Sequence, residues 1–331
     1  MKIGFIGLGN VGGKLAGSLL RNACDLTVND IDHTVAASFQ LRGAKLAASP
    51  KALAEQCDVI VTCLPSPAVC AQVMEAPDGV LAGLSCGKLW LEMSTTDEAE
   101  VRRIGERVKA LGAEAIDCPV SGGCHRADTG NISIFAGCSR SAFERVLPIL
   151  TTMGRRVIHT GPLGSASILK VITNYLCTAH LAALSEALTA AKVLGMDMNV
   201  TYEAIKASSG NSFVHETESQ VILNGSRDIS FTMDLVLKDV GLFDQLTRRA
   251  GMPLEIAPLL VDIFADGEAR FGARELSPNI IRRLEEACDV QVLGQGFPAY
   301  MVDDEPEEPG YEVLVQGRGD AVVAGGRNAA I

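Results

Sequence analysis

The feature that most constrains the fold of this chain is a glycine-rich turn directly behind its first apolar segment. Residues 2–6 form a short apolar run suited to a buried strand, and residues 7–12 read Gly-Leu-Gly-Asn-Val-Gly. Apolar residues at helical spacing follow, and residues 26–28 form a second apolar run. A strand, a glycine turn, a helix and a second strand in this order are typical of a dinucleotide-binding unit.

Each glycine of the turn has a separate task in such a unit. Gly7 allows the tight turn, Gly9 lets the backbone approach the pyrophosphate, and Gly12 lets the helix pack on the strand. The N-terminus of the helix then faces the phosphates with free N–H groups. A purely structural turn is the alternative. The candidate cofactor-binding residues of this turn are Gly7, Leu8, Gly9, Asn10, Val11 and Gly12.

An acidic residue at the end of the second strand indicates which dinucleotide is used. Asp30 can accept hydrogen bonds from the ribose hydroxyls and would repel a 2′-phosphate. The next residue is Ile31, and no arginine or lysine stands beside it. We therefore predict NAD rather than NADP. The alternative is that Asp30 is a solvated turn residue and that Asp32 or His33 matters more.

Apolar strands continue to alternate with helical segments up to residue 163. This alternation predicts an α/β fold, a Rossmann-type doubly wound parallel sheet that forms an NAD-binding domain over residues 1–163. Ligands gather at the carboxyl ends of the strands in such sheets. Three segments stand there: Leu64-Pro65, Ser94-Thr95 and Ser121-Gly122-Gly123. N–H groups beside glycines can hold an anion, so the third segment is a candidate anion site, with a plain tight turn as the alternative.

A long helical pattern begins near Ser165 and predicts an interdomain helix. Lys170 and Asn174 are four residues apart and share one face of it. Their neighbours are largely apolar, and burial lowers the pKa of a lysine into the range of a general acid/base. A solvated surface lysine is the alternative. A second lysine, Lys238, lies in a later helical segment and either reaches back to the cofactor or is solvated.

The remainder of the chain divides into two further parts. Residues 164–290 keep a helical pattern and predict an all-helical domain for substrate binding and oligomerisation. Residues 291–331 form a C-terminal extension that is acidic and loop-like. Within it, residues 311–316 are suited to one strand, and the glycine- and alanine-rich residues 317–331 predict a mobile end.

Composition narrows the partners and the compartment. The formal charge of −11 argues against nucleic acid and against an anionic membrane surface. Ten cysteines occur without a CxxC pair or a zinc-type spacing, which predicts a reducing cytoplasm, no metal and no disulfide framework. The N-terminal apolar run is too short for a signal peptide, and no run of about 20 uninterrupted apolar residues predicts a membrane span.

The motifs together resemble the β-hydroxyacid dehydrogenase family, the group of 3-hydroxyisobutyrate dehydrogenase, tartronate semialdehyde reductase and the glyoxylate/succinic semialdehyde reductases. The resemblance covers roughly residues 1–290. It rests on the glycine turn, Cys63-Leu64-Pro65, Ser94-Thr95, residues 117–123, Lys170 with Asn174, Ser208-Ser209-Gly210 and Lys238-Asp239.

The resemblance implies a role for each matching residue. Lys170 is similar to the catalytic lysine of the family, and Asn174 to its substrate-orienting amide. Lys238 is similar to the lysine that closes over the cofactor. The substrate-carboxylate cradle would be Ser121, Gly122 and Gly123, and the cofactor-lining residues would be Leu64, Pro65 and Thr95. The family also implies a homodimer or homotetramer formed through the helical half.

These observations predict an NAD-dependent 3-hydroxyacid dehydrogenase that oxidises a short carboxylate substrate, similar to 3-hydroxyisobutyrate, to its semialdehyde or keto acid. Lys170 would act as the general acid/base. Two alternatives remain at this point. One is an NADPH-dependent reductase of an aldehyde acid or an imine, and the other is a non-catalytic scaffold that binds a dinucleotide.

Overall fold

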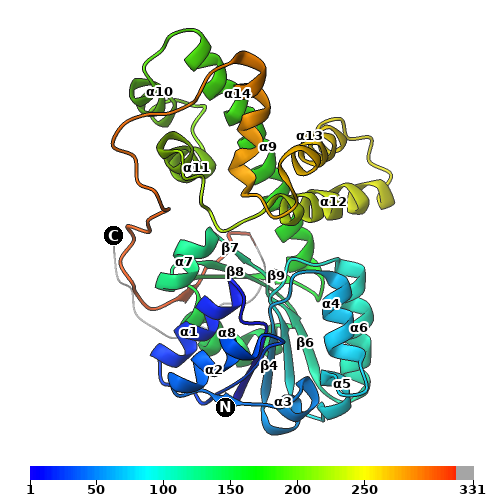
Figure 1. The fold of residues 1–331 in the computed structure, drawn as a ribbon. Coiled ribbons are helices and arrows are strands. Elements are labelled where there is room, and N and C mark those ends of the chain that lie inside the picture. Colours follow the sequence, from blue (N-terminus) through cyan, green and yellow to red (C-terminus); the bar gives the residue numbers. More distant parts are fainter. Residues whose placement is uncertain (318–331) are drawn as a thin grey trace.

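The computed structural model describes residues 1–317 and consists of an α/β part and an all-helical part. Figure 1 shows a sheet with helices on both faces and the helical part above it. One long helix, α9 (Ser165–Val193), runs from the sheet into the helical part. The predicted fold class is thereby confirmed. The mobility predicted for the end of the chain falls on residues 318–331, which lie outside the described residues.

The strands of residues 1–317 form one ten-stranded sheet in the order β10-β9-β8-β6-β5-β4-β1-β2-β3, with β7 paired to β8 off this path. Neighbouring strands pair in parallel except that β8 runs antiparallel to both β6 and β7. The strands are β1 (Ile3–Ile6), β2 (Leu26–Asn29), β3 (Lys45–Leu46), β4 (Val59–Thr62), β5 (Leu89–Glu92), β6 (Glu114–Asp117), β7 (Val120–Ser121), β8 (Ser133–Gly137), β9 (Arg156–Gly161) and β10 (Tyr311–Glu312).

Helices cover both faces of this sheet (Figure 1). One face carries α1 (Gly12–Arg21), α2 (His33–Leu41), α7 (Gly123–Thr129) and α8 (Arg140–Met153). The other carries α3 (Pro50–Gln56), α4 (Pro67–Glu75), α5 (Val80–Gly83) and α6 (Glu98–Ala110). Successive strand residues point to opposite faces, so Phe5 enters one hydrophobic core and Ile6 the other. Burial on both faces explains why the central strands are apolar throughout.

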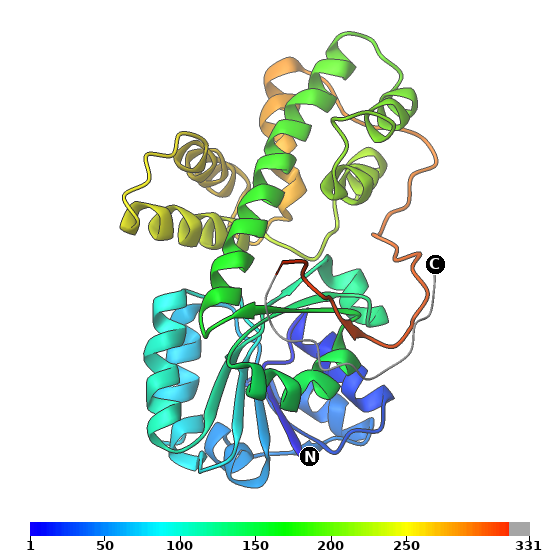
Figure 2. The same ribbon diagram turned by 180° about the vertical axis from the view of Figure 1, so that it is seen from behind.

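The helical part is arranged around the far end of α9. Figures 1 and 2 show α10 and α11 on one side of α9, and α12 and α13 on the other. The elements are α10 (Met198–Lys206), α11 (Phe213–Asn224), α12 (Met233–Arg249), α13 (Ile256–Phe271), the 3-10 helix η1 (Ser277–Ile281) and α14 (Arg282–Cys288). Their apolar faces meet in a third core that includes Leu181 and Leu188 of α9.

Within the described residues, α9 is the helix whose length and apolar composition would suffice to cross a membrane, with a mean hydropathy of 1.2. The core helix of a soluble protein passes the same test. α9 contributes Val171 to one hydrophobic cluster and Leu181 to another, while other apolar side chains such as Leu176 remain exposed.

The chain returns to the sheet after α14. Residues 289–310 descend from the helical part, and β10 then adds to the sheet parallel to β9 (Figure 2). Tyr311 pairs with Arg156 in the register of the two strands. The predicted strand over residues 311–316 is therefore present, but it is shorter than expected.

One carboxylate lies buried between α9 and α11. The Glu218 side chain is 7% exposed, and its Oε1 lies 3.8 Å from the Cys177 Sγ. Its Oε2 has no hydrogen-bond partner among the described residues. Burial raises the pKa of Glu218 from 4.5 to about 7, because the charged form is poorly solvated there.

The close packing of α1 on β1 gives a first prediction. A Cβ on Gly12 would overlap the carbonyl oxygen of Gly7, whereas a Cβ on Gly9 would meet no atom within 4 Å. We expect Gly12→Ala to lower the free energy of unfolding by about 1–3 kcal/mol, a typical cost of overpacking. Gly9→Ala is the control and should leave it unchanged. Denaturant unfolding measures both, and equal stability of the two variants would contradict this packing.

The buried Glu218 gives a second prediction, on pH. Its folded-state pKa is raised, so its stabilising effect is complete below about pH 4.5 and is lost as the pH rises through about 7. The loss in free energy of unfolding should reach about 3 kcal/mol. Glu218→Gln should remove this pH dependence, and Glu216→Gln, at an exposed position on the same helix, should retain it. Denaturant unfolding between about pH 4 and pH 8 tests this.

Candidate active site

The glycine turn forms one end of the site. Gly7 follows β1 and Gly12 begins α1, whose N-terminus carries no side-chain cap. Gly9 faces open space, which belongs to a cavity of about 240 Å³ beside Asn10. The uncapped N–H groups and the missing Cβ leave room for a phosphate group next to the backbone. These residues therefore fit a dinucleotide.

Asp30 lies beside this turn at the end of β2. Its Oδ2 accepts a hydrogen bond from the Leu8 N–H at 2.5 Å, and its Oδ1 accepts one from the Asp32 N–H at 2.8 Å. Asp30 is therefore fixed to the glycine turn, unlike a solvated turn residue. Asp32 has a different task, since its side chain caps the N-terminus of α2. The Ile31 side chain between them is 97% exposed.

The loops after β4 and β5 are held by a buried carboxylate that the sequence did not single out. Glu92 is fully buried at the end of β5 and accepts hydrogen bonds from the Thr62 hydroxyl and the Ser94 N–H, both at 2.7 Å. Ser94 Oγ in turn accepts one from the Leu64 N–H at 2.7 Å. Burial raises the pKa of Glu92, and its donors oppose that shift. The loops that carry Leu64, Pro65 and Thr95 are thus connected.

The candidate anion site follows β6 and β7. Gly122 and Gly123 have φ values of 131° and 89°, in the region that favours glycine. A Cβ on Gly122 would lie 3.2 Å from the Arg126 Cδ, and one on Gly123 would lie 2.8 Å from the His125 ring. Glycine is therefore needed at both positions. The turn from Ser121 into α7 therefore has a glycine-rich backbone whose N–H groups can hold an anion.

The start of α9 is fixed by Asp117, at the end of β6. This fully buried carboxylate accepts hydrogen bonds from the Gly164 N–H at 2.8 Å, the Ser167 N–H at 2.7 Å and the Ser167 hydroxyl at 2.9 Å. Burial raises the pKa of Asp117, while these donors favour the charged form. These hydrogen bonds connect the end of β6, just before the candidate anion site, to α9, which carries Lys170.

Lys170 begins a chain of polar contacts across the two parts of the molecule. It is 9% exposed, and its Nζ donates to the Asn174 Oδ1 at 2.8 Å. The Asn174 Nδ2 donates to the Asp239 Oδ2 at 2.5 Å, and the Lys238 Nζ lies 2.7 Å from the other oxygen of Asp239. Lys238 also donates to the Thr95 carbonyl oxygen at 3.0 Å.

Burial sets the charge state of this lysine. It lowers the pKa of Lys170 below the usual 10.5, and the nearby positive charge of Lys238 adds to the effect. The carboxylate of Asp239 opposes the shift. The surroundings therefore favour the neutral amine more than water does, which suits a group that takes up and releases a proton.

The structure brings together Lys170, Asn174, Lys238 and Thr95, and α9 also packs against β7, which ends at Ser121. Three supporting carboxylates were not predicted from the sequence: Glu92 belonged to no motif, and Asp117 and Asp239 stood in motifs without an assigned role. For Glu92, the signal available in the sequence was a charged residue inside an otherwise apolar strand. Within residues 1–317, no group of three or more His, Cys, Asp or Glu residues is placed to hold a metal ion.

Two family models match nearly all of the chain up to residue 284. Residues 2–161 match the NAD-binding domain of 6-phosphogluconate dehydrogenase. Residues 164–284 match the model described as NAD-binding of NADP-dependent 3-hydroxyisobutyrate dehydrogenase.

Individual relatives and solved structures agree with these two family models. The chain is 30% identical to 2-(hydroxymethyl)glutarate dehydrogenase of Eubacterium barkeri, over 89% of this chain and 98% of the relative. The structure is similar to 3-hydroxyisobutyrate dehydrogenase of Mycobacterium tuberculosis, solved with L-serine (TM-score 0.77, 25% identity, 86% and 98% coverage). It is also similar to 3-hydroxyisobutyrate dehydrogenase of Salmonella typhimurium (TM-score 0.77, 28% identity, 86% and 99% coverage). The chain therefore belongs to the β-hydroxyacid dehydrogenase family.

Proposed function

We propose that this protein oxidises a short 3-hydroxy acid, such as 3-hydroxyisobutyrate, with NAD, and that Lys170 is the general acid/base. Membership of the family makes it a hydroxyacid dehydrogenase that uses a nicotinamide dinucleotide. The main support for Lys170 as the general acid/base is that its amine is buried, is held by Asn174 and has a lowered pKa.

The names of the relatives support a common substrate core. 2-(Hydroxymethyl)glutarate, 3-hydroxyisobutyrate and L-serine all carry a CH₂OH group on the carbon next to a carboxylate. They differ only in the other substituent of that carbon. A site with one anion cradle and one proton-transfer group suits this shared core.

The choice of NAD rests on Asp30. Its carboxylate lies beside the glycine turn, where a ribose 2′-phosphate would meet a negative charge. The residues that follow are Ile31, Asp32 and His33, so neither a lysine nor an arginine stands there to hold that phosphate. Use of NADPH for the reduction of an aldehyde acid or imine remains an outcome that a cofactor titration would reveal.

The residues of the site divide the work between binding and proton transfer. The N–H groups of Ser121, Gly122 and Gly123 bind the substrate carboxylate. The neutral Lys170 amine takes the hydroxyl proton at Nζ, and its positive charge then stabilises the developing alkoxide, while Asn174 orients the substrate. The glycine turn, Leu64, Pro65, Thr95 and Lys238 would hold NAD, which would supply the hydride acceptor.

We also propose that the protein works in the cytoplasm as a homodimer or homotetramer. Exposed apolar side chains on α9 and α13, among them Leu169, Leu176 and Leu259, offer surface for a second copy. The net charge of −11 disfavours nucleic acid and anionic membranes as partners and leaves a small carboxylate as the expected ligand.

Removal of the amine tests the proposed catalytic group. Lys170→Ala should lower kcat by roughly 10²–10⁴-fold, the usual contribution of a general acid/base, and leave NAD binding intact. Lys192→Ala, at a partly buried lysine in the last turn of the same helix, is the matched control and should keep full activity. NADH formation from 3-hydroxyisobutyrate measures both. Wild-type turnover by Lys170→Ala would rule out the assignment.

The lowered pKa of Lys170 gives a prediction on pH. Oxidation needs the neutral amine, so kcat/KM for the acid should rise with pH through a pKa below 10.5 and then level off. Reduction of the aldehyde needs the protonated amine and should fall through the same pKa. Initial rates in both directions across mildly acidic to alkaline pH test this. If the residual activity of Lys170→Ala rises with pH through the same pKa as the wild type, that pKa belongs to another group.

A further inference from the structure

The segment that follows α14 ties the two parts of the molecule together. We call residues 294–313 the C-terminal strap. Its first half is held by the helical part, where the Asn224 Nδ2 donates to the Phe297 carbonyl oxygen and the Ser226 hydroxyl to the Ala299 carbonyl oxygen, both at 2.7 Å. The strap lies beyond residue 284, where the match to the family models ends.

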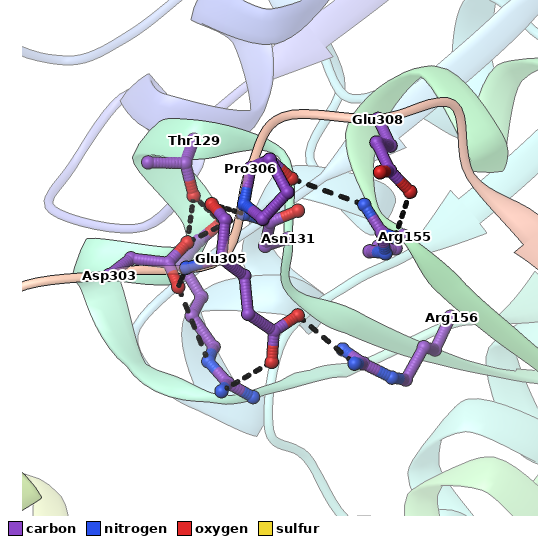
Figure 3. A network of polar contacts seen from close by, with 9 residues as sticks. Thr129, Asn131, Arg155, Arg156, Asp303, Glu305, Pro306 and Glu308 are labelled. Atoms are coloured by element: carbon purple, nitrogen blue, oxygen red, sulfur yellow. Dashed lines mark hydrogen bonds and ion pairs between the residues drawn. The ribbon is translucent and has the colours of Figure 1, made fainter.

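The second half of the strap is held by the α/β part (Figure 3). The Asp303 carboxylate accepts hydrogen bonds from the Thr129 hydroxyl and from the Asn131 Nδ2, the latter at 2.8 Å. Further on, the Tyr311 N–H donates to the Arg155 carbonyl oxygen at 2.8 Å. Only three residues, 300–302, lie between Ala299, which is held by the helical part, and Asp303, which is held by the α/β part.

The crossing lies next to the anion cradle. A Cβ built on Gly123 would lie 3.5 Å from the Met301 Cε and 2.9 Å from the His125 Nδ1. Burial lowers the pKa of His125, so this ring is neutral near pH 7. An apolar methyl group and an uncharged ring therefore border the cradle on this side.

The strap also forms ion pairs with Arg126, the cationic side chain beside the cradle. The Arg126 stem lies against Gly122, with its Cδ 3.2 Å from where a Cβ would be. Its Nη2 donates to the Glu305 Oε1 at 2.9 Å, and its Nε lies 3.8 Å from the Asp303 Oδ1. The guanidinium also lies over the Phe213 ring, 4.7 Å from the centroid. Arg126 is thereby neutralised by the protein's own carboxylates.

We propose that the C-terminal strap determines specificity for the substituent on C2 of the substrate. Met301 limits the size of that substituent, and Glu305 withholds Arg126 from a second substrate carboxylate. The site then selects short monocarboxylic 3-hydroxy acids over dicarboxylic ones. This inference rests on the proposed function, because it assumes that the cradle binds the substrate carboxylate.

The chemistry of the substrate places C2 at this border. In a 3-hydroxy acid, C2 is bonded to the carboxylate, while C3 carries the hydroxyl and must lie toward Lys170. The C2 substituent is therefore the part that can reach Met301 and Arg126. A second carboxylate there would meet Asp303 and Glu305, whose cationic partners Arg126 and Arg156 are already engaged in ion pairs with them. Such a juxtaposition of like charges lowers affinity.

Three substrates distinguish the effect of the size of the C2 substituent from the effect of its charge. They are 3-hydroxyisobutyrate, 2-(hydroxymethyl)glutarate and the neutral 5-amide of the latter. We expect Glu305→Gln to raise kcat/KM for the dicarboxylate relative to 3-hydroxyisobutyrate by roughly tenfold, since Arg126 becomes available, and to leave the amide unchanged. Met301→Ala should raise kcat/KM for both larger acids by roughly tenfold.

The matched control is Glu308→Gln, which removes a carboxylate that pairs with Arg155 farther along the same strap. Its substrate ratios should equal those of the wild type. Ratios measured within one variant do not depend on how much of that variant is folded. Wild-type ratios in both Glu305→Gln and Met301→Ala would overturn the inference, and so would equal shifts in Glu308→Gln.

A binding measurement separates this inference from the proposed function. If the wild type oxidises none of the three acids with NAD or NADP, the proposed function fails. The strap is then tested by calorimetry on the NAD-loaded protein with propionate and glutarate. Weaker binding of glutarate in the wild type, reversed in Glu305→Gln, supports the inference. The same ratio of affinities in both proteins overturns it.

Discussion

The contact between Asp117 and the N-terminus of α9 is the constraint on which the site depends. A buried carboxylate accepts three hydrogen bonds from Gly164 and Ser167 and lies at the positive end of the helix dipole. A helix is rigid, so fixing its first turn also fixes Lys170 one turn later. The same residue ends β6, just before the chain forms the anion cradle. One side chain thus sets the distance between the two groups that we propose act on one substrate.

A second set of contacts connects the chemistry to the cofactor loops. Lys170, Asn174, Asp239, Lys238 and Thr95 form a continuous polar chain from α9 through α12 to the loop after β5. Two lysines share this region with one carboxylate, which limits the positive charge that can be held there. Burial is the main cause of the lowered pKa of Lys170, and the positive charge of Lys238 adds to it. Binding of a dinucleotide at Thr95 would therefore act on the same chain that holds Lys170, the proposed general acid/base.

The sequence predicts the parts of the fold and site that depend on local order. The glycine turn, the alternation of strands and helices and the i, i+4 pair of Lys170 and Asn174 are all visible within short windows. Asp117 and Asp239 act across 50 and 65 residues, on Ser167 and Asn174, and no local pattern marks such contacts. The strap is the extreme case, because its Glu305 pairs with Arg156 and Arg126, which lie 149 and 179 residues earlier in the chain.

The position of β10 also bears on how the protein is made. This strand covers β9, which would otherwise be an edge of the sheet, and it lies near the end of the described chain. A ribosome releases the whole helical part before β10 can pair, so β9 stays open during most of synthesis. An open edge strand invites pairing with other chains. The α/β part therefore completes its sheet only after translation has passed the second domain, and the two domains mature together instead of one after the other.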